Sequence, residues 1–398
     1  MQNLYNQITF LTGNEEDLNA APETAVLPMF SDLAVSFLSA LSSELMHDRR
    51  TRNMPDVLSY AYWIRKSSLV STKERYSESD RRIGRGIAFH VAPSNVPVNF
   101  AVSMTSSLLA GNITVIRVSD KQFEQVTVIC DAINRLIVSD FQEMKKYIFI
   151  MRYSHSRVIT DWLSSICDLR IIWGGDSTIA EIRKSLLPPR AVEMTFPDRH
   201  SVAVINSDVY LQNDASVVAK GFYTDTYYTD QNACSSPRLV FWLGRNTEQA
   251  QECFWKALSE LVHTDYQMKP VQAVDKYSML CRLGMKQDGV HLQNNDNMMM
   301  RISVDDLTSD LMDYKMSGGY FFEYCARGIS ELLPVLGKRC QTVSVLGVDK
   351  NDILSLVIRN GVRGVDRIVP LGETMGLEFV WDGYKMIEAM TRLIYINL

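Results

Sequence analysis

The sequence predicts an α/β protein built from more than one domain. Three observations support this: strands and helices alternate from residue 87 onward, the expected strands are almost wholly apolar, and the chain has 398 residues. Strands that are apolar on both faces are typical of parallel sheets covered by helices on each side. A chain of this length exceeds one core of usual size, so two or three domains are expected.

Helical patterns fill the first part of the chain. An apolar stripe at helical spacing predicts a helix from Ser31 to Leu45. A second helix is expected from Pro55 to Ile64, with the proline in its first turn. The charged segment from Ser71 to Arg82 has no clear apolar periodicity and is expected to be a connection.

Two turns in the alternating region are candidates for binding a phosphate. Pro93-Ser94-Asn95 and Gly174-Gly175-Asp176 each follow an expected strand and open a helix. Glycines let a backbone approach a phosphate closely, and the amino end of a helix favours its charge. A plain connection is the alternative at both places. The expected strands are 87–91, 113–116, 147–150, 169–173 and 202–205, and the expected helices are 97–110, 122–137, 157–167 and 177–186.

The second half of the chain shows a similar but less regular pattern. Helices and strands again alternate, and no internal repeat is found. The expected helices are 215–222, 247–263 and 271–283, and the expected strands are 239–243, 300–304, 319–322 and 343–346.

Charge and composition exclude several classes of function. The formal net charge is −5 and acidic and basic residues alternate, so no basic surface for nucleic acid is expected. No stretch of about 18 apolar residues predicts a membrane span, and the amino terminus lacks the features of a secretion signal. Seven cysteines at irregular spacing favour reduced thiols in a cytoplasmic protein, and the six histidines do not cluster as metal ligands.

Cys234 differs from the other cysteines in its surroundings. It lies among small and polar residues in the run TDQNACSSPR and directly precedes an expected strand. Cys253, Cys281 and Cys325 instead have neighbours in the sequence of the kind that usually surrounds structural thiols. A thiolate is accessible near neutral pH and is a strong nucleophile, so Cys234 is a candidate nucleophile. From spacing alone, a structural thiol is the alternative.

Taken in order, these motifs resemble the aldehyde dehydrogenase superfamily. PSNVP at 93–97 looks like its P-W-N-[FY]-P turn, and LLAGNITVIRVSD at 108–120 is similar to its L-A-x-G-N-x-V-V-x-K-P-S-E segment. The glycine turn at 174–176 falls where the superfamily has T-G-S, and QNACSSPR at 231–238 looks like its cysteine motif. More narrowly, the runs at 55–66, 91–100, 230–238 and 364–384 resemble the fatty acyl-CoA reductases of the bacterial bioluminescence (LuxC) type.

The resemblance implies an aldehyde dehydrogenase-like α/β fold. It consists of a Rossmann-type cofactor domain and a second α/β domain that carries the catalytic cysteine. We expect residues 1–206 to form the amino-terminal helices and the cofactor domain, and residues 207–370 the catalytic domain. We expect residues 371–398 to form a segment that packs back or lies at an oligomer interface.

The resemblance also implies roles for particular residues. Cys234 matches the nucleophile, and Asn95 matches the side-chain donor of the oxyanion hole, with the Cys234 amide as the second donor. An arginine at 117, where the superfamily has lysine, favours NADPH over NADH, although Asp120 could bind a 2′-hydroxyl and favour NADH. The residues that match the cofactor site are Arg117, Ser119, Asp120, Gly174, Gly175 and Asp176.

The implied activity is reduction of a fatty acyl thioester, such as acyl-CoA, to an aldehyde with NAD(P)H. The general-base glutamate of the superfamily has no clean equivalent, and Glu193 is the one candidate. No acid stands near residues 340–343, where the superfamily has a cofactor-contacting glutamate. Because reduction needs no activated water, the missing base agrees with it.

Two other functions stay open at this point. An aldehyde dehydrogenase that makes acids would need a base such as Glu193. A non-catalytic subunit that holds acyl chains for partner enzymes would need neither base nor cofactor. The resemblance further implies an acyl-protein synthetase as a partner, as in luminous relatives, and assembly into a homo-oligomer.

Overall fold

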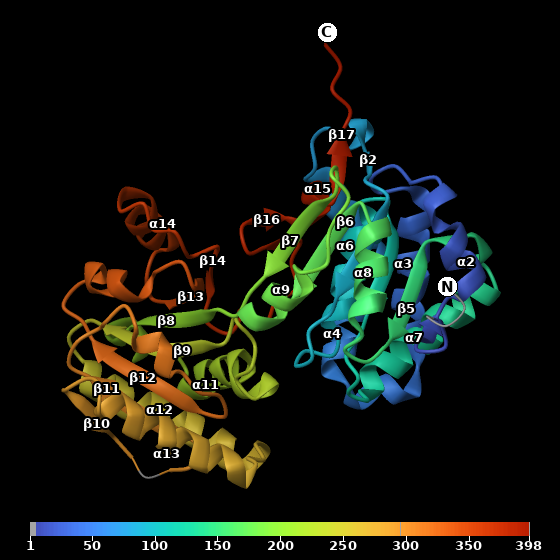
Figure 1. Cartoon of the computed structure of the whole chain (residues 1–398). Coiled ribbons are helices and arrows are strands. Elements are labelled where there is room, and N and C mark those ends of the chain that lie inside the picture. The colour runs from blue at the N-terminus through green and yellow to red at the C-terminus, as the bar shows by residue number, and fades with distance from the viewer. Residues whose placement is uncertain (1–4, 295, 398) are drawn as a thin grey trace. The chain divides into compact units, whose positions relative to one another are not determined.

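Two sheets of mainly parallel strands organise the chain, one in each of two units (Figure 1). The computed structural model describes residues 5–294 and 296–397. The first unit runs to Pro197 and resumes at Leu377, and the second is Asp198–Gly376. The division precedes the expected one after residue 206, because the strand His200–Asn206 pairs within the second sheet.

The first sheet has six strands. In spatial order they are β1 (Thr9–Thr12), β5 (Ile148–Arg152), β4 (Ile113–Arg117), β3 (Ile87–Val91), β6 (Leu169–Trp173) and β7 (Val192–Phe196). All are parallel except β1, and β3 is buried at every position. The chain builds outward from β3 to β5 and then crosses back to β6. The strand order therefore reverses between β3 and β6, the place where open α/β sheets bind ligands.

Helices cover both faces of this sheet. In chain order they are α2 (Glu15–Ala20), α3 (Asp32–His47), α4 (Pro55–Trp63), α5 (Lys66–Glu74), α6 (Asn99–Leu109), α7 (Glu124–Val138), α8 (Arg157–Ile166) and α9 (Asp176–Ile182). Right-handed crossovers place α6 and α7 on one face and α8 and α9 on the other. Because α3 packs against α6 and α7, the amino-terminal helices form a second layer over that face.

The segment from Leu377 onward returns to the first unit. Trp63 stacks on Phe379 with ring centroids 4.3 Å apart, and Asn112 donates a hydrogen bond of 3.0 Å to the carbonyl of Met390. The elements involved are β2 (Arg82–Gly84), β15 (Val380–Trp381), β16 (Tyr384–Lys385), α15 (Met386–Ala389) and β17 (Thr391–Leu393). β17 pairs with β2, so the end of the chain is fixed by backbone hydrogen bonds as well as by apolar packing.

The second unit is built on a seven-stranded sheet. In spatial order its strands are β10 (Val290–Leu292), β11 (Met300–Val304), β12 (Tyr320–Cys325), β9 (Pro237–Leu243), β8 (His200–Asn206), β13 (Cys340–Leu346) and β14 (Arg367–Pro370). Only β10 is antiparallel to its neighbour within this sheet. Alternate residues of β9 enter two apolar clusters, Leu239 and Phe241 in one and Val240 and Trp242 in the other.

The helices of the second unit are α10 (Ser207–Tyr210), α11 (Ala215–Asp225), α12 (Thr247–Asp265), α13 (Pro270–Gly284) and α14 (Lys350–Arg359). α11 and α12 pack against each other and bury an aromatic cluster that includes Phe222 and Phe254, with ring centroids 5.1 Å apart. α13 differs from them, because Lys276 and Leu283 are its only buried residues.

Several elements of the structure were not expected from the sequence, and α5 and β7 are two of them. The expected connection from Ser71 begins inside α5, whose single buried residue, Leu69, leaves too little apolar periodicity to reveal a helix. The edge strand β7 was not expected, because Glu193 and Thr195 are partly exposed and interrupt the apolar run. Both errors arise where an element buries only part of its surface.

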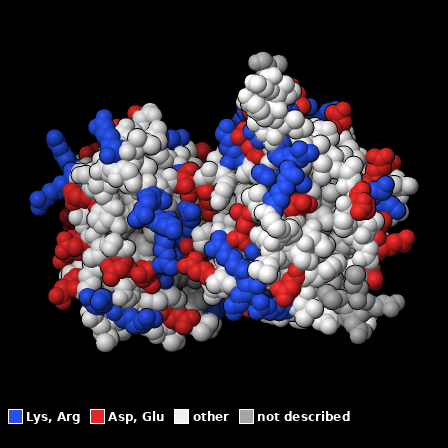
Figure 2. Space-filling view, turned by 45° about the horizontal axis from the view of Figure 1, so that its top comes forward, with Lys and Arg blue, Asp and Glu red and all other residues white. Residues whose placement is uncertain are grey.

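The surface carries both signs of charge. Figure 2 shows acidic and basic side chains interspersed over the visible face, as the alternating sequence pattern indicates. Within the part of the chain that the structure describes, none of the helices combines the length and the apolar composition that crossing a bilayer demands.

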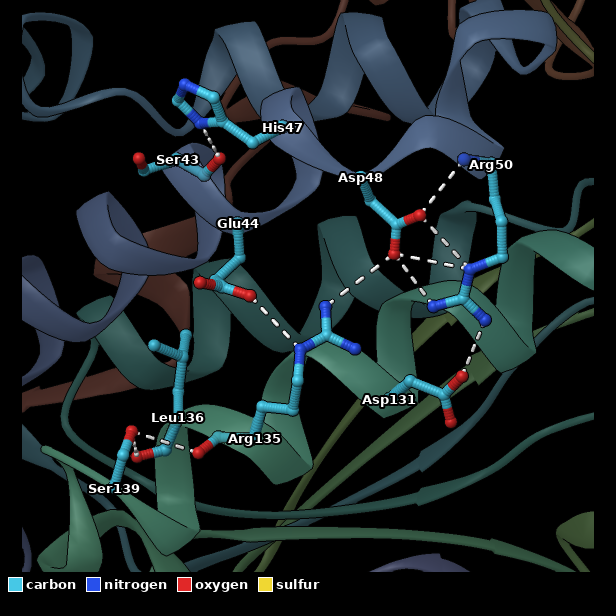
Figure 3. A network of polar contacts seen from close by, with 9 residues as sticks. All are labelled: Ser43, Glu44, His47, Asp48, Arg50, Asp131, Arg135, Leu136 and Ser139. Carbon is cyan, nitrogen blue, oxygen red and sulfur yellow. Dashed lines mark hydrogen bonds and ion pairs between the residues drawn. The ribbon is translucent and has the colours of Figure 1, made fainter.

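A cluster of ion pairs joins the end of α3 to α7 (Figure 3). Arg50 binds Asp48 at 2.7 Å and Asp131 of α7 at 2.7 Å. One turn along α7, Arg135 pairs with Glu44 of α3 at 3.1 Å. The hydrogen bonds from Arg50 lower the pKa of Asp48, whose side chain is 12% exposed, to about 2. The cluster therefore fastens the amino-terminal helices to the layer that covers the sheet.

We expect Asp48→Asn to lower the free energy of unfolding by about 1 kcal/mol at pH 7, because it removes the charge that Arg50 pairs with. A lowered pKa means that this contribution is present above the ordinary value of 3.8 and is lost as the pH falls toward 2. Urea unfolding at pH 7 and pH 3.5 measures both effects. Asp131→Asn, at a position 44% exposed, serves as the control and should cost less. Equal stability of Asp48→Asn and the unmodified protein at pH 7 would contradict the expectation.

Candidate functional site

Cys234 lies in a tight turn at the amino edge of the second sheet. The N–H of Ser236 donates to the carbonyl of Ala233 at 3.1 Å, so Cys234 and Ser235 are the central residues of a turn that leads into β9. Cys234 itself is partly exposed, whereas Ser235 is buried. At the start of β8, the Ser201 hydroxyl donates to the Cys234 carbonyl at 2.8 Å. The backbone of the candidate nucleophile is thus tied to a neighbouring strand.

Gln231 holds the approach to this turn. It is fully buried, and its Nε2 donates to the carbonyls of Pro237 at 3.0 Å and Tyr320 at 3.2 Å. Its Oε1 accepts the N–H groups of Gly319 and Tyr320, both at 3.0 Å. Every hydrogen-bonding position of the amide is therefore used, and the side chain joins β9 to β12.

Gln231 is one of four residues with positive φ in two segments that contact each other. Asp230 and Gln231 have φ of 54° and 55°, and Gly318 and Gly319 have φ of 68° and 80°. This conformation costs roughly 1–2 kcal/mol for a residue with a side chain. The N–H of Gly318 donates to the Asp230 carbonyl at 3.1 Å, and a Cβ at Gly319 would lie 2.1 Å from the carbonyl of Met298. Position 319 therefore requires glycine. Asp230 and Gln231, which carry side chains, are held in this conformation by hydrogen bonds.

Arg238 places a buried cation near the thiol. The residue is 7% exposed, and its Nη1 donates to the carbonyl of Met316. Its Nε is buried and has no hydrogen-bond partner among the described residues. Burial lowers the pKa of Arg238 to about 10, against the opposing charges of Cys234, Asp198 and Asp230. The guanidinium therefore lacks part of its usual solvation and would gain from a thiolate at Cys234.

His200 at the start of β8 is not a base for this thiol. Burial lowers its pKa to about 4, and the charges of Lys315, Arg238 and Arg339 act in the same direction. Its Nε2 forms a hydrogen bond of 3.0 Å with the carbonyl of Val335. The ring is therefore neutral near pH 7, and its Nε2 is occupied by the hydrogen bond to the Val335 carbonyl.

A loop after β14 adjoins the Cys234 turn. Asp225, at the end of α11, accepts the N–H groups of Gly372 at 2.6 Å and Thr374 at 2.9 Å. Burial raises the pKa of Asp225 to about 6. The hydroxyl of Ser235 contacts the sulfur of Met375 at 3.6 Å. Asp225 thus fixes the loop that packs against the residue after Cys234.

The first unit carries the remaining candidate residues at the carboxyl edge of its sheet. Asn95 is exposed in the turn after β3. Gly174 and Gly175 follow β6, and Gly175 precedes the first residue of α9, the exposed Asp176. A Cβ at Gly175 would meet no atom within 4 Å, so this turn faces open space. These two turns flank the point at which the strand order reverses.

The residues after β4 lie beside the same edge. The Arg117 guanidinium is directed to Tyr153, with its Nε and Nη2 3.4 Å from that carbonyl oxygen. Ser119 and Asp120 follow in the turn, and Asp120 is exposed. Lys121, which the motif comparison did not single out, donates to the Ser94 carbonyl at 3.1 Å and links the turns after β3 and β4. A small apolar pocket lies beside them, lined by Ala92, Pro93, Val96, Pro97, Phe100, Val118, Ser119, Phe123 and Val126.

Glu193, the candidate general base, is engaged by two arginines. On β7 of the first unit, its Oε2 pairs with Arg170 at 2.5 Å and its Oε1 with Arg183 at 2.6 Å. Both carboxylate oxygens are therefore occupied in ion pairs within that unit. Among the described residues, no group of three or more histidine, cysteine, aspartate and glutamate side chains could hold a metal ion.

The structure thus gathers the expected cofactor residues in the first unit and places Cys234 in the second. Sequence reasoning missed the residues that support Cys234. Gln231 was quoted only as part of a motif, and Ser201 and Asp225 carry no pattern of their own. The pair Gly318-Gly319 was the one available signal, because adjacent glycines before a strand often mark backbone that a side chain would obstruct.

The family model for acyl-CoA reductase (LuxC) matches residues 15–280. The long-chain acyl-protein thioester reductase of Aliivibrio fischeri is 24% identical over 301 residues, which cover 72% of this chain and 58% of that protein. The long-chain acyl-protein thioester reductase 2 of Photobacterium leiognathi is 25% identical over 167 residues, covering 41% of this chain and 33% of that protein. The matched region therefore spans less than two thirds of each relative.

Solved aldehyde dehydrogenases share the fold. Aldehyde dehydrogenase 21 from Physcomitrella patens, in complex with succinate, superimposes with a TM-score of 0.69 at 12% identity, covering 94% of this chain and 87% of that one. Lactaldehyde dehydrogenase from Escherichia coli has a TM-score of 0.66 at 13% identity, covering 95% and 89%. The aldehyde dehydrogenase-like α/β fold expected from the sequence is confirmed.

Gln231→Ala should lower the free energy of unfolding by about 3 kcal/mol. The backbone groups of Pro237, Gly319 and Tyr320 lose the hydrogen bonds that the amide makes with them. Urea unfolding measures the loss. Gln293→Ala is the matched control, since the exposed side chain of that glutamine makes one hydrogen bond, of 2.6 Å, to the Ser303 hydroxyl. Similar stabilities for the two variants would show that the buried amide contributes little.

Proposed function

Because the chain belongs to the acyl-CoA reductase (LuxC) family, we propose that it reduces a fatty acyl thioester to an aldehyde with a nicotinamide cofactor. The setting of Cys234 carries the proposal. The thiol is partly exposed, follows a segment held by the buried Gln231, and lies near the buried cation of Arg238. A fixed, accessible thiol beside a positive charge is suited to attack a carbonyl carbon.

The proposed reaction proceeds through an acyl group on Cys234. The thiolate attacks the thioester carbonyl, a new carbon–sulfur bond forms, and the thiolate of the donor leaves and takes up a proton. A bound nicotinamide cofactor supplies the hydride that reduces the acyl carbon. The Cys234 thiolate then departs as the aldehyde forms, so the residue returns to its starting state.

Asn95 is proposed to stabilise the oxyanion during attack. Its side-chain N–H and the amide of Cys234 are the donors that the family resemblance assigns to this role. The exposure of Asn95 in the turn after β3 supports the assignment, because the side chain is accessible to a ligand. Removing one such donor typically costs about 3 kcal/mol of transition-state stabilisation.

The residues of the first unit fit a nicotinamide dinucleotide. The strand order reverses between β3 and β6, and Gly175 faces open space there, so a pyrophosphate can approach the backbone. NADPH is proposed over NADH, because Arg117 and Lys121 bring two cations to this edge. Asp120 beside them is the residue that would favour a 2′-hydroxyl instead.

The position of Glu193 supports reduction over oxidation of an aldehyde to an acid. An oxidising enzyme must activate water to release the acid, and it needs a base for this step. Both oxygens of Glu193 are held by arginines at 2.5 and 2.6 Å. Thioester reduction needs no such base, since the donor thiolate is itself a good leaving group.

The names of the relatives support a proposal for the acyl donor. The named relatives are acyl-protein thioester reductases, so an acyl group carried on a protein is proposed as a donor beside acyl-CoA. An acyl-protein synthetase is the corresponding partner. We further propose that the protein works in the cytoplasm as a homo-oligomer.

Cys234→Ala should take up no label from a radioactive acyl donor, because the residue that forms the covalent bond is gone. Asn95→Ala should acylate about 100-fold more slowly or worse, while its affinity for NADPH stays unchanged. Gel fluorography after incubation with labelled acyl-CoA measures acylation, and NADPH fluorescence measures cofactor binding. Normal labelling of Cys234→Ala would remove Cys234 from the reaction.

Arg238→Met should move acylation to higher pH. Without the cation the thiolate of Cys234 is less stable, so more alkaline solution is needed to form it. Arg238→Lys keeps the charge and is the matched control, with a profile close to that of the unmodified protein. The initial rate of acylation between pH 6 and pH 10 measures the shift, and coincident profiles for all three proteins would exclude this role for Arg238.

A further inference from the structure

The helix α13, labelled in Figure 1, buries few of its residues. Of its 15 residues, Lys276 and Leu283 alone are buried, and Val271 and Val274 are exposed. A buried lysine is costly to keep, and burial lowers the pKa of Lys276 to about 8. Apolar packing therefore does not explain why the polar side chain of Lys276 is buried.

Gln272 connects the first turn of α13 to Asp230. Its Nε2 donates to both carboxylate oxygens of Asp230, at 2.9 and 2.8 Å. Its Oε1 accepts the N–H of Lys269 at 2.7 Å, so the same amide caps the helix. The hydroxyl of Tyr266, just before α13, donates to the same carboxylate. The first of the two left-handed residues is thereby fixed from outside the sheet.

Lys276 reaches the glycine side of the same structure. Its Nζ donates to the carbonyl of Gly318 at 2.6 Å and to the carbonyl of Asn297. The N–H of Gly318 in turn donates a hydrogen bond to the Asp230 carbonyl at 3.1 Å. Gln272 and Lys276 are one helical turn apart (276 − 272 = 4), so they share a face of α13. Two routes from one helix thus converge on Asp230.

We propose that α13 positions the thiol of Cys234 through Gln272 and Lys276. Asp230 and Gln231 hold a backbone conformation that residues with side chains rarely adopt, and Cys234 follows in the same segment. When Gln272 releases Asp230, the pair can relax toward negative φ, and the thiol moves away from its place near Arg238. Gln272 and Lys276 are positioning residues, and their importance for acyl transfer rests on the proposed function.

Gln272→Glu tests the first route in the full chain. The new carboxylate faces Asp230 and removes the donated hydrogen bonds, yet its oxygen can still accept the Lys269 N–H. We expect the alkylation of Cys234 by iodoacetamide at pH 7 to slow about tenfold, because a small displacement of a reactive group has large effects on rate. The peptide that contains Cys234 is followed by mass spectrometry, so the other cysteines do not interfere.

The double variant Asp230→Asn with Gln272→Glu supplies a rescue. The asparagine amide can donate to the new carboxylate, which restores the contact with its direction reversed. Its alkylation rate should return to within about twofold of the unmodified protein, since the two positions are directly coupled. A purely structural loss in either single position would add in the double variant and give no recovery.

Lys276→Met tests the second route, and Gln251→Leu is the matched control. Lys276→Met should also slow alkylation about tenfold. Gln251 of α12 donates to the buried Glu323 at 3.0 Å, a comparable contact that does not involve Asp230, and its variant should alkylate at the normal rate. If Gln272→Glu does not fold, Lys276→Met decides the matter.

Normal alkylation in Gln272→Glu or in Lys276→Met overturns the proposal, as does a double variant that is no faster than Gln272→Glu. Labelling by acyl-CoA in the same proteins separates this inference from the proposed function. Absent labelling in the unmodified protein, together with the expected alkylation pattern, would refute the reductase and support the positioning role. Labelling that falls in parallel with alkylation supports both.

Discussion

The buried amide of Gln231 is the interaction on which the second unit depends. It holds β9 to β12 through hydrogen bonds of 3.0 to 3.2 Å and keeps two adjacent residues at positive φ. A glutamine amide is uncharged, so it can be buried at far lower cost than a carboxylate or an amine, provided that all its positions are paired. This side chain holds the backbone that leads into the Cys234 turn. Gln272 of α13 holds the adjacent Asp230, and the Ser201 hydroxyl donates to the Cys234 carbonyl.

Much of the fold could be predicted, because the strands that matter are buried on both faces. β3, β4, β5 and β6 are mostly apolar and buried over almost their whole length, and such runs are visible without knowledge of their neighbours. β7 and α5 escaped prediction for the opposite reason. Each buries part of one surface, and its place is decided by the element beside it. Composition and periodicity record what a residue prefers and contain nothing about which neighbour is present.

The candidate site was predictable only where its residues form motifs. Cys234 and Asn95 could be named from local sequence, and both occupy turns next to strands. Two other features could not be predicted from the sequence. They are the direction of the Arg117 side chain toward Tyr153 and the ion pairs of Glu193 with two arginines, and both depend on contacts across the first unit. The two units also use opposite edges: the expected cofactor residues follow strands, whereas Cys234 precedes one. A rule that looks only at the carboxyl ends of strands would overlook the thiol.

The return of the chain to its first unit sets an order on synthesis. A ribosome makes the first unit up to Pro197, then the whole of the second unit, and only then the segment that supplies Phe379, Ile387 and Met390 to the first core. Until that segment emerges, β2 has no partner strand and part of the first core is open to water. The second unit, made from one uninterrupted stretch, can finish earlier. The part of the protein that bears the thiol can therefore complete its folding before the part that would bind the cofactor.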